Sequence, residues 1–271
     1  MGIGGLTYRG EMRVAAIQHD IVWEDPAANF VRLAPMIRAA GDDGAQLIVL
    51  SEMFATGFTM RSHMFAEPID GPTVAFLIAA AQNTGAHVAG SFACAQATDN
   101  DTAAAKAAPL PTNTLVVASP NGGIERYDKI HPFTFAREND AYAAGSGVHS
   151  VLIDGVRVSL FVCYDLRFAP EIWSVAPTTD LYIFPANWPA SRRHHWTSLL
   201  TARAIENQAY VLGANRVGTH GKLSYVGDSM IVDPLGETLA HAEEHEAIVM
   251  ATVDPELVAR VRSAFPFMAD R

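Results

Sequence analysis

Cysteine is scarce in this chain, and concentrated positive charge and long apolar runs are absent. Two cysteines, Cys94 and Cys163, occur among 271 residues, and the formal net charge is −10 without a lysine- or arginine-rich run. Phosphate binding needs concentrated positive charge, so the sequence argues against nucleic acid as a partner. No apolar stretch is long enough to span a bilayer, and the glycine-rich start at 1–10 lacks the apolar block of a signal peptide. We expect a cytoplasmic protein with free thiols, no membrane contact and a loose lead-in at 1–10.

Metal-binding motifs are also absent. The sequence contains no His-x-x-x-His or Cys-x-x-Cys spacing. His194 and His195 lie in a helical pattern, where adjacent side chains point in different directions and cannot both face one ion well. We therefore expect no metal site, and we expect His131 to anchor the loop that follows Lys129.

The apolar pattern predicts a layered α/β fold. The hydrophobic content of 49% and the charged content of 18% are typical of a globular protein with a large core. Strand-like and helical patterns alternate early in the chain and strands dominate later, which predicts mixed sheets. We expect one domain over 1–271, with its core at about 13–253 and a polar surface excursion at 95–111. The expected strands are 13–18, 47–50, 87–93, 114–118, 157–163, 181–184, 210–215, 229–232 and 247–253.

Four helices are expected between these strands. The first begins with Asp25 as its cap and Pro26 in its first turn, and it ends at Gly41. Pro35 lies inside this pattern and predicts a kink or a later start. The other expected helices are 73–83, 170–175 and 191–208.

Cys163 lies where an apolar, strand-like run turns polar, in the sequence Ser-Leu-Phe-Val-Cys-Tyr-Asp-Leu-Arg-Phe at 159–168. Glu52 and Lys129 also lie at the edges of strand-like runs. A thiol, a carboxylate and an ammonium group at such positions together predict nucleophilic attack on a polar carbon. Taken singly, each residue has a structural interpretation: a buried thiol, a carboxylate that caps a turn and an exposed lysine.

The three side chains have complementary roles in such chemistry. A cysteine attacks as a thiolate, and an unperturbed thiol has a pKa of about 8.5. Glu52 can remove the thiol proton, and Lys129 can stabilise both the thiolate and the oxyanion on the attacked carbon. The backbone N–H of Tyr164 points to the same oxyanion if a helix begins after Cys163. An amide or nitrile substrate would form a thioester and release ammonia before water completes the cycle.

Glu52, Lys129 and Cys163 each lie in a short sequence motif, and the three motifs follow one another in the order found in a known family. They are Ser-Glu-Met-Phe at Glu52, Tyr-Asp-Lys-Ile-His at Lys129 and Val-Cys-Tyr-Asp-Leu-Arg-Phe at Cys163. From about 13 to 253 the chain resembles the nitrilase, or carbon–nitrogen hydrolase, superfamily. The resemblance implies a four-layer α-β-β-α sandwich with mixed sheets, a Glu-Lys-Cys triad, and a homodimer or higher homo-oligomer. It also implies no metal and no cofactor. Family members often carry a second glutamate, and Glu138 is the matching residue; the alternative is a loop glutamate paired with Arg137 in solvent.

Two further stretches indicate a branch of the superfamily. Members that act on nitriles usually have Trp-Glu after the cysteine, whereas this chain has Tyr164-Asp165, which counts against nitrile chemistry. The stretch Phe-Pro-Ala-Asn-Trp-Pro-Ala-Ser-Arg-Arg-His-His-Trp at 184–196 resembles the omega-amidase branch, whose members hydrolyse the side-chain amide of 2-oxoglutaramate or 2-oxosuccinamate. Asn187 and Trp188 would then line the pocket, although Trp188 could instead be a core aromatic residue.

An omega-amide substrate also carries a carboxylate, which the planar fork of an arginine binds well. Arg167 has the alternative of a structural ion pair with Glu171 or Asp165. On the fourth helix, Arg203 and Glu206 are expected to form a buried ion pair, and Cys94 is expected to be a packed core thiol. The candidates for the carboxylate site are Arg167, Arg192, Arg193 and Arg137.

The sequence therefore predicts a cysteine-dependent amidase for a small linear amide, in the omega-amidase branch. An N-carbamoyl-compound amidohydrolase or a nitrilase of the same superfamily is the alternative among hydrolases, and acyl transfer to an amine would use the same thioester. A catalytically silent binding protein on this scaffold is the alternative outside enzymes. The presence of all three reactive side chains counts against it.

Overall fold

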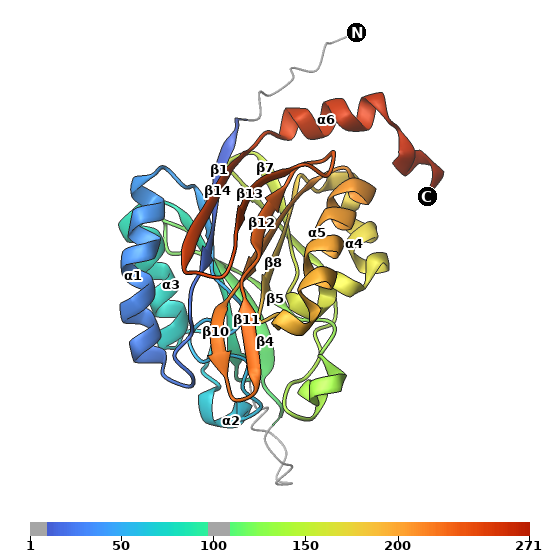
Figure 1. Cartoon of the computed structure of the whole chain (residues 1–271). Coiled ribbons are helices and arrows are strands. Elements are labelled where there is room, and N and C mark those ends of the chain that lie inside the picture. The colour runs from blue at the N-terminus through green and yellow to red at the C-terminus, as the bar shows by residue number, and fades with distance from the viewer. Residues whose placement is uncertain (1–9, 97–108) are drawn as a thin grey trace, which may run out of the picture.

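Two six-stranded mixed sheets form the centre of the protein (Figure 1). The computed structural model describes residues 10–96 and 109–271, so nearly all of the expected lead-in and most of the expected excursion at 95–111 lie outside the described residues. In spatial order the first sheet contains β14 (Ala247–Val253), β1 (Met12–Gln18), β2 (Leu47–Val49), β3 (His87–Cys94), β4 (Thr112–Ala118) and β5 (Ile124–Asp128). The second contains β13 (Thr238–Ala242), β12 (Ser229–Val232), β9 (Tyr210–Asn215), β8 (Leu181–Ala186), β7 (Val156–Leu160) and β6 (His149–Ile153).

The parallel pairs lie in the middle of each sheet. In the first sheet β2 pairs in parallel with β1 and β3, and in the second sheet β8 pairs in parallel with β7 and β9. The outer pairs are antiparallel, including β12 with β13, which the short turn at 232–237 joins as expected. A separate hairpin consists of β10 (Val217–His220) and β11 (Leu223–Val226).

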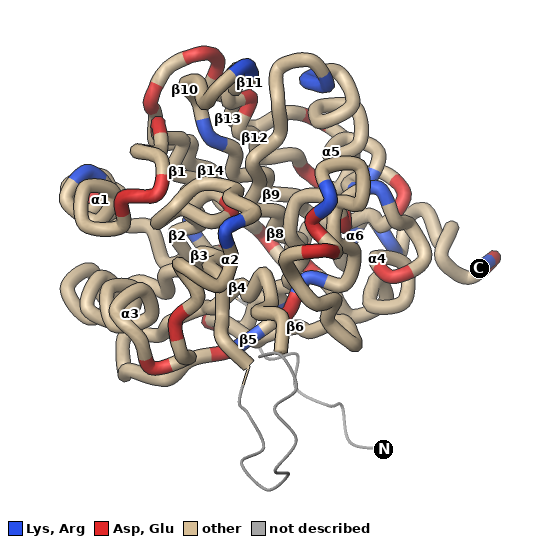
Figure 2. The backbone as a smooth tube through the Cα atoms, turned by 90° about the horizontal axis from the view of Figure 1, so that it is seen from below, with Lys and Arg blue, Asp and Glu red and all other residues tan. Residues whose placement is uncertain are grey.

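Helices cover the outer faces of the two sheets, which completes an α-β-β-α sandwich. Figure 2 shows α1 and α3 on one side of the molecule and α4 and α5 on the other. In β1, Val14 and Ala16 pack in the core between the sheets, whereas Ala15 and Ile17 pack against the helices of the first layer. Because both faces of the central strands are buried, their sequences are continuously apolar. The helices are α1 (Pro26–Asp42), α2 (Ser62–Phe65), α3 (Pro72–Thr84), α4 (Ala169–Val175), α5 (Arg193–Asn207) and α6 (Pro255–Ala264).

The first helix begins as its sequence predicts, but Pro35 does not delay it. The carboxylate of Asp25 accepts a hydrogen bond of 3.0 Å from the backbone N–H of Ala28. From Pro26 onward α1 is continuous, so the expected later start is wrong. Pro35 and Val31, whose carbonyl loses its usual partner, are both exposed, and solvent can replace the missing hydrogen bond.

The strand that leads to Cys163 is shorter than expected. β7 ends at Leu160 rather than at 163, and a 3₁₀ turn at Cys163–Arg167 follows. The turn lets the chain leave the sheet and bring Cys163 to the sheet edge. Within residues 10–96 and 109–271, no helix is both long and apolar enough to cross a membrane.

Candidate active site

The ends of four strands bring the predicted residues to one edge of the sandwich. Glu52, Cys163 and Asn187 follow the carboxyl ends of β2, β7 and β8, which each take part in a parallel pair. Lys129 follows β5, whose last residue, Asp128, pairs with Thr114 near the start of β4. In open α/β sheets, ligand sites form beyond the carboxyl ends of parallel strands.

A cavity of about 150 Å³ lies at this edge. Seven of the eight predicted site residues line it, and the eighth, Glu138, lies directly behind Lys129. The volume admits a small substrate only, because drug-sized ligands occupy cavities of roughly 300–1,000 Å³. The seven are Glu52, Lys129, Cys163, Tyr164, Arg167, Asn187 and Trp188.

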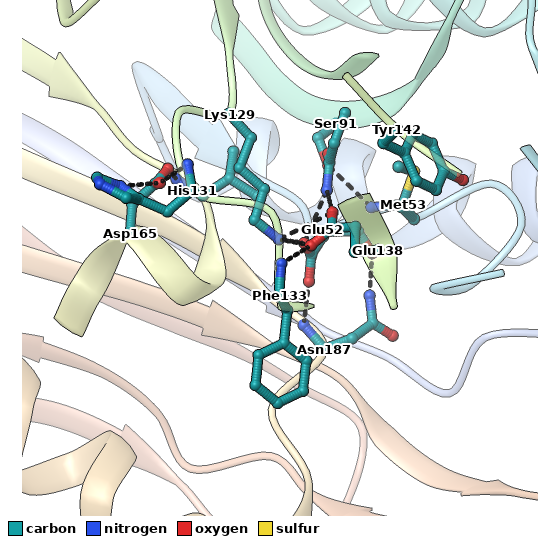
Figure 3. A network of polar contacts seen from close by, with 12 residues as sticks. Glu52, Met53, Ser91, Lys129, His131, Phe133, Glu138, Tyr142, Asp165 and Asn187 are labelled. Atoms are coloured by element: carbon teal, nitrogen blue, oxygen red, sulfur yellow. Dashed lines mark hydrogen bonds and ion pairs between the residues drawn. The ribbon is translucent and has the colours of Figure 1, made fainter. Parts of the chain in front are cut away.

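The ammonium group of Lys129 lies between two buried carboxylates (Figure 3). Its Nζ is 2.9 Å from Glu52 Oε1 and 2.9 Å from Glu138 Oε2. Burial opposes the charged ammonium, but the charges of Glu138 and Glu52 outweigh this effect and raise the pKa of Lys129 well above its usual value. Lys129 therefore stays positively charged. Glu138 is fully buried, whereas Arg137 pairs with Asp140 at the surface, so the alternative pair of Glu138 with Arg137 is wrong.

Asn113 is a member of this cluster that the sequence analysis missed. Its Nδ2 donates to Glu52 Oε1 (2.8 Å) and to Glu138 Oε1 (3.2 Å). The other carboxylate oxygen of Glu52 accepts a hydrogen bond of 3.0 Å from the backbone N–H of Asn187. Both oxygens of Glu52 are thus held in place. The available signal was a polar amide immediately before the expected strand 114–118.

Cys163 begins the 3₁₀ turn in a left-handed backbone conformation, with a φ of 45°. This conformation is uncommon for residues other than glycine and asparagine, and it occurs preferentially at functional sites. Burial raises the pKa of the Cys163 thiol well above its usual value, and the negative charge of Glu52 adds to this effect, whereas Lys129 opposes it. The free thiol is therefore protonated at neutral pH and needs a base before it can attack.

Asp165 connects the turn at Cys163 to the loop that follows Lys129. Its Oδ1 accepts a hydrogen bond of 3.0 Å from the backbone N–H of His131, and the ring Nδ1 of His131 lies 3.1 Å from the same oxygen. Its Oδ2 accepts a hydrogen bond of 2.8 Å from Tyr127 Oη. The expected anchoring role of His131 is confirmed, and the anchor reaches the turn that begins at Cys163.

Arg167 and Arg192 line the cavity. The Cζ of Arg167 lies 4.8 Å from the ring centroid of Trp188, and the Cζ of Arg192 lies 5.3 Å from that of Phe133. In the part of the chain that the structure describes, neither arginine has a carboxylate partner. Trp188 lines the cavity and is also nearly fully buried, so the two interpretations of this residue are both correct.

The other candidate arginines are neutralised elsewhere. Arg193 lies 2.9 Å from Asp228, and Arg137 lies 2.7 Å from Asp140. The expected alternative for Arg167 is wrong, since Asp165 binds His131 instead of the arginine. Glu171 likewise lies 3.3 Å from His131 Nε2.

Two other expectations away from the cavity are confirmed. Arg203 Nη1 lies 2.7 Å from Glu206 Oε1, so the expected ion pair forms; the arginine is buried, whereas the glutamate is partly exposed. Cys94 is a free, fully buried thiol in the core. Among the described residues, no group of three or more histidine, cysteine, aspartate or glutamate side chains is placed to hold a metal ion.

The chain belongs to the carbon–nitrogen hydrolase family, whose sequence model matches residues 13–263. It is therefore an enzyme of the class that hydrolyses carbon–nitrogen bonds other than peptide bonds.

Relatives that are named as amidases align with almost the whole chain. The chain is 37% identical to omega-amidase YafV of Escherichia coli (strain K12) over 96% of both chains, and 34% identical to 2-oxoglutaramate amidase of Bacillus subtilis (strain 168) over 95% of this chain and 96% of that one. A solved carbon–nitrogen hydrolase superfamily protein from Xanthomonas campestris, with an arsenic adduct in its active site, aligns with a TM-score of 0.87, 35% identity and 97% coverage of each chain.

Proposed function

We propose that this enzyme is an omega-amidase that hydrolyses the side-chain amide of 2-oxoglutaramate or 2-oxosuccinamate through a thioester on Cys163. The observation that carries the proposal is the buried cluster of Glu52, Lys129 and Glu138 beside Cys163, in a small cavity that also presents two arginines. The relatives named omega-amidase and 2-oxoglutaramate amidase support this choice of substrate.

Acylation begins with proton transfer from the Cys163 thiol to the Glu52 carboxylate. The thiolate attacks the amide carbon, and the carbonyl electrons move to the oxygen, which becomes an oxyanion. When the tetrahedral intermediate collapses, the carbon–nitrogen bond breaks and the leaving nitrogen takes the proton from Glu52. Ammonia departs, and the acyl group remains on the sulfur as a thioester.

Deacylation reverses these roles with water as the nucleophile. Glu52 takes a proton from water, whose oxygen attacks the thioester carbon. The carbon–sulfur bond then breaks, and the proton on Glu52 returns to the sulfur. The products are a dicarboxylic acid and the regenerated thiol, so one carboxylate serves both half-reactions.

Lys129 is positioned to stabilise the oxyanion in both steps. Its Nζ donates to Glu52 Oε1 (2.9 Å) and lies within hydrogen-bond distance of both oxygens of Glu138 (3.1 and 2.9 Å). An ammonium group has three N–H donors, and one N–H shared between the two Glu138 oxygens leaves a donor for the substrate oxygen. Glu138 acts here as a positioning residue that fixes the Lys129 side chain from behind. The backbone N–H of Tyr164, at the start of the 3₁₀ turn, supplies a second donor for the oxyanion.

The cavity supports a substrate that carries a carboxylate beyond the amide. Arg167 and Arg192 provide two charged forks, while Asn187 and Trp188 form the adjoining wall. A charge-assisted hydrogen bond from arginine contributes roughly 1.5–3 kcal/mol, which favours acidic amides over neutral amides of the same length.

We further propose that the enzyme is a cytoplasmic homodimer. Both cysteines are free thiols, as a reducing compartment requires. Three large apolar side chains remain exposed: Trp173 of α4, Phe265 and Phe267. The C-terminal residue packs against α4, because Arg271 Cζ lies 5.1 Å from the centroid of the Trp173 ring. Sedimentation velocity tests this proposal: the wild-type protein should sediment as a dimer, and Trp173→Asp should shift it toward the monomer.

A substrate panel tests the proposed activity. Ammonia release is measured from 2-oxoglutaramate, 2-oxosuccinamate, an N-carbamoyl amino acid and an aliphatic nitrile, with mass spectrometry of the protein to detect an adduct on Cys163. We expect the two omega-amides to give the highest kcat/KM values. Preferred turnover of the carbamoyl compound or the nitrile would replace the omega-amidase assignment by one of these activities.

A further inference from the structure

One wall of the active-site cavity comes from the β10–β11 hairpin, which Figure 1 shows projecting beyond the ends of the two sheets. Tyr225 of β11 lines the cavity and is only 6% exposed. No residue that the structure describes forms a hydrogen bond with its hydroxyl group. The ring is buried but the hydroxyl oxygen remains accessible, so this unpaired donor is available to a ligand in the cavity.

Arg216 supports the ring of Tyr225 from behind. It is fully buried, and its Cζ lies 4.6 Å from the ring centroid, within the range of a cation–π contact. Its Nη2 donates to Asp20 Oδ1 (2.9 Å) and its Nε donates to the carbonyl of Val217 (3.0 Å). These hydrogen bonds hold the guanidinium group of Arg216 in place, and the guanidinium group in turn supports the ring of Tyr225.

The hairpin itself is also held firmly. The backbone N–H of Val217 donates to the carbonyl of His19 (3.1 Å), and the rings of Trp23 and His220 stack with their planes 11° apart. These contacts join the hairpin to the segment that follows β1. The hydroxyl group of Tyr225 is thus presented by a pre-organised wall, which lowers the entropy cost of binding a ligand.

The phenol is suited to donate to a neutral oxygen. Burial raises the pKa of Tyr225, although Arg216 opposes this effect, so the hydroxyl keeps its proton at neutral pH. In a 2-oxo omega-amide, the reacting amide lies at Cys163 and the carboxylate has the arginines Arg167 and Arg192. The remaining polar group of such a substrate is its 2-oxo oxygen, which needs a donor.

We infer that Tyr225 is a specificity residue whose hydroxyl donates a hydrogen bond to the 2-oxo oxygen of the substrate, and that Arg216 is a positioning residue for its ring. This inference rests on the proposed omega-amidase function. It also predicts discrimination against a 2-amino amide such as glutamine. An ammonium group at this position would lie among the guanidinium groups of Arg167, Arg192 and Arg216, which repel it.

The test compares two substrates that differ only at the 2-position. Glutaramate has the same carboxylate and amide as 2-oxoglutaramate but carries a methylene group in place of the 2-oxo group. For Tyr225→Phe we expect kcat/KM for 2-oxoglutaramate to fall about 10- to 100-fold, mainly through KM, because the 2-oxo oxygen loses its donor. The value for glutaramate should change less than about threefold. Arg216→Lys should also lower the ratio of kcat/KM for 2-oxoglutaramate to kcat/KM for glutaramate.

Tyr182→Phe is the matched control, because Tyr182 is also a buried tyrosine but donates to the carbonyl of Ile172 (3.1 Å) away from the cavity. It should leave the ratio of the two kcat/KM values unchanged. If Tyr225→Phe lowers both values equally, or neither, while the wild-type enzyme hydrolyses 2-oxoglutaramate, this inference is wrong and the proposed function stands. If the wild-type enzyme hydrolyses neither 2-oxoglutaramate nor 2-oxosuccinamate, both are wrong.

Discussion

Lys129 lies between the buried carboxylates of Glu52 and Glu138, so replacing it by methionine removes a positive charge that compensates both. The side chains of Lys129 and Glu52 are each 1% exposed and that of Glu138 is fully buried. Removing one partner of a buried ion pair costs about 3–5 kcal/mol because the remaining charge is left uncompensated. Lys129→Met leaves two such charges, so we expect a loss of at least this size, out of a total stability of roughly 5–15 kcal/mol.

The pH dependence of this loss follows from Glu138. Burial raises its pKa, an effect that Lys129 opposes and the charge of Glu52 reinforces. Removing Lys129 therefore raises the Glu138 pKa further. A carboxyl group whose pKa is higher in the folded state lowers stability as the pH rises above its unfolded value of about 4.3. The destabilisation by Lys129→Met should be largest near about pH 7–8 and should shrink toward about pH 5.

Urea unfolding at matched protein concentration measures both effects. Lys222→Met is the control, because Lys222 is exposed and its replacement should change the unfolding free energy by less than about 0.5 kcal/mol. Adding Glu138→Gln to Lys129→Met should recover part of the lost stability, since it removes one uncompensated charge. A Lys129→Met protein within about 1 kcal/mol of wild type at neutral pH, or a loss independent of pH, would refute this reasoning.

Three further predictions concern the surrounding residues. Arg167→Leu and Arg192→Leu should each raise KM for 2-oxoglutaramate about 10- to 100-fold, whereas Arg137→Leu should leave it unchanged; steady-state kinetics decides this. Asn113→Leu should lower kcat about 10-fold or more with little change in KM, because Glu52 loses a donor; an unchanged kcat would contradict this. Burial opposes protonation of His131, but its two acidic neighbours raise its pKa overall. The stability that this histidine supplies is therefore fully present below its unfolded pKa of about 6.5 and is lost as the pH rises through the folded value. His131→Gln should accordingly destabilise the protein more at about pH 6 than at about pH 9 in urea unfolding, and an equal loss at both would count against it.

The sequence predicted the central strands and the residues at their ends because both are strongly constrained. Strands buried on both faces need continuous apolar runs, and a polar residue at the end of such a run is conspicuous. Glu52, Lys129 and Cys163 all have this form, and the structure places them at one cavity. The roles of these residues, and the assignment of the whole chain to one domain, stay predictions.

The peripheral elements were not predicted because their sequences are only weakly constrained. β5, β6 and β13 are edge strands whose residues are partly exposed, so their sequences lack a clear apolar run. α6 does carry a helix-start signal, since the carboxylate of Asp254 accepts a hydrogen bond from Glu256 N (2.8 Å) and Pro255 follows the cap. The expected core simply ended before it.

The roles of the missed residues depend on side-chain contacts that a single sequence does not reveal. Asn113 bridges two glutamates that lie 61 and 25 residues away in the chain. Arg216 and Tyr225 face each other across a hairpin that has no strongly apolar pattern. A single sequence gives the type of each residue but not its partner, and here the partner decides the role.

The most direct test of the account is ammonia release from 2-oxoglutaramate by Cys163→Ala, compared with the wild-type enzyme at equal concentration. Cys163→Ala should bind the substrate and unfold like the wild type but turn it over at least about 1,000-fold more slowly, because no other group can form the thioester. A folded Cys163→Ala protein that releases ammonia at a tenth of the wild-type rate or faster would show that the sulfur is not the nucleophile.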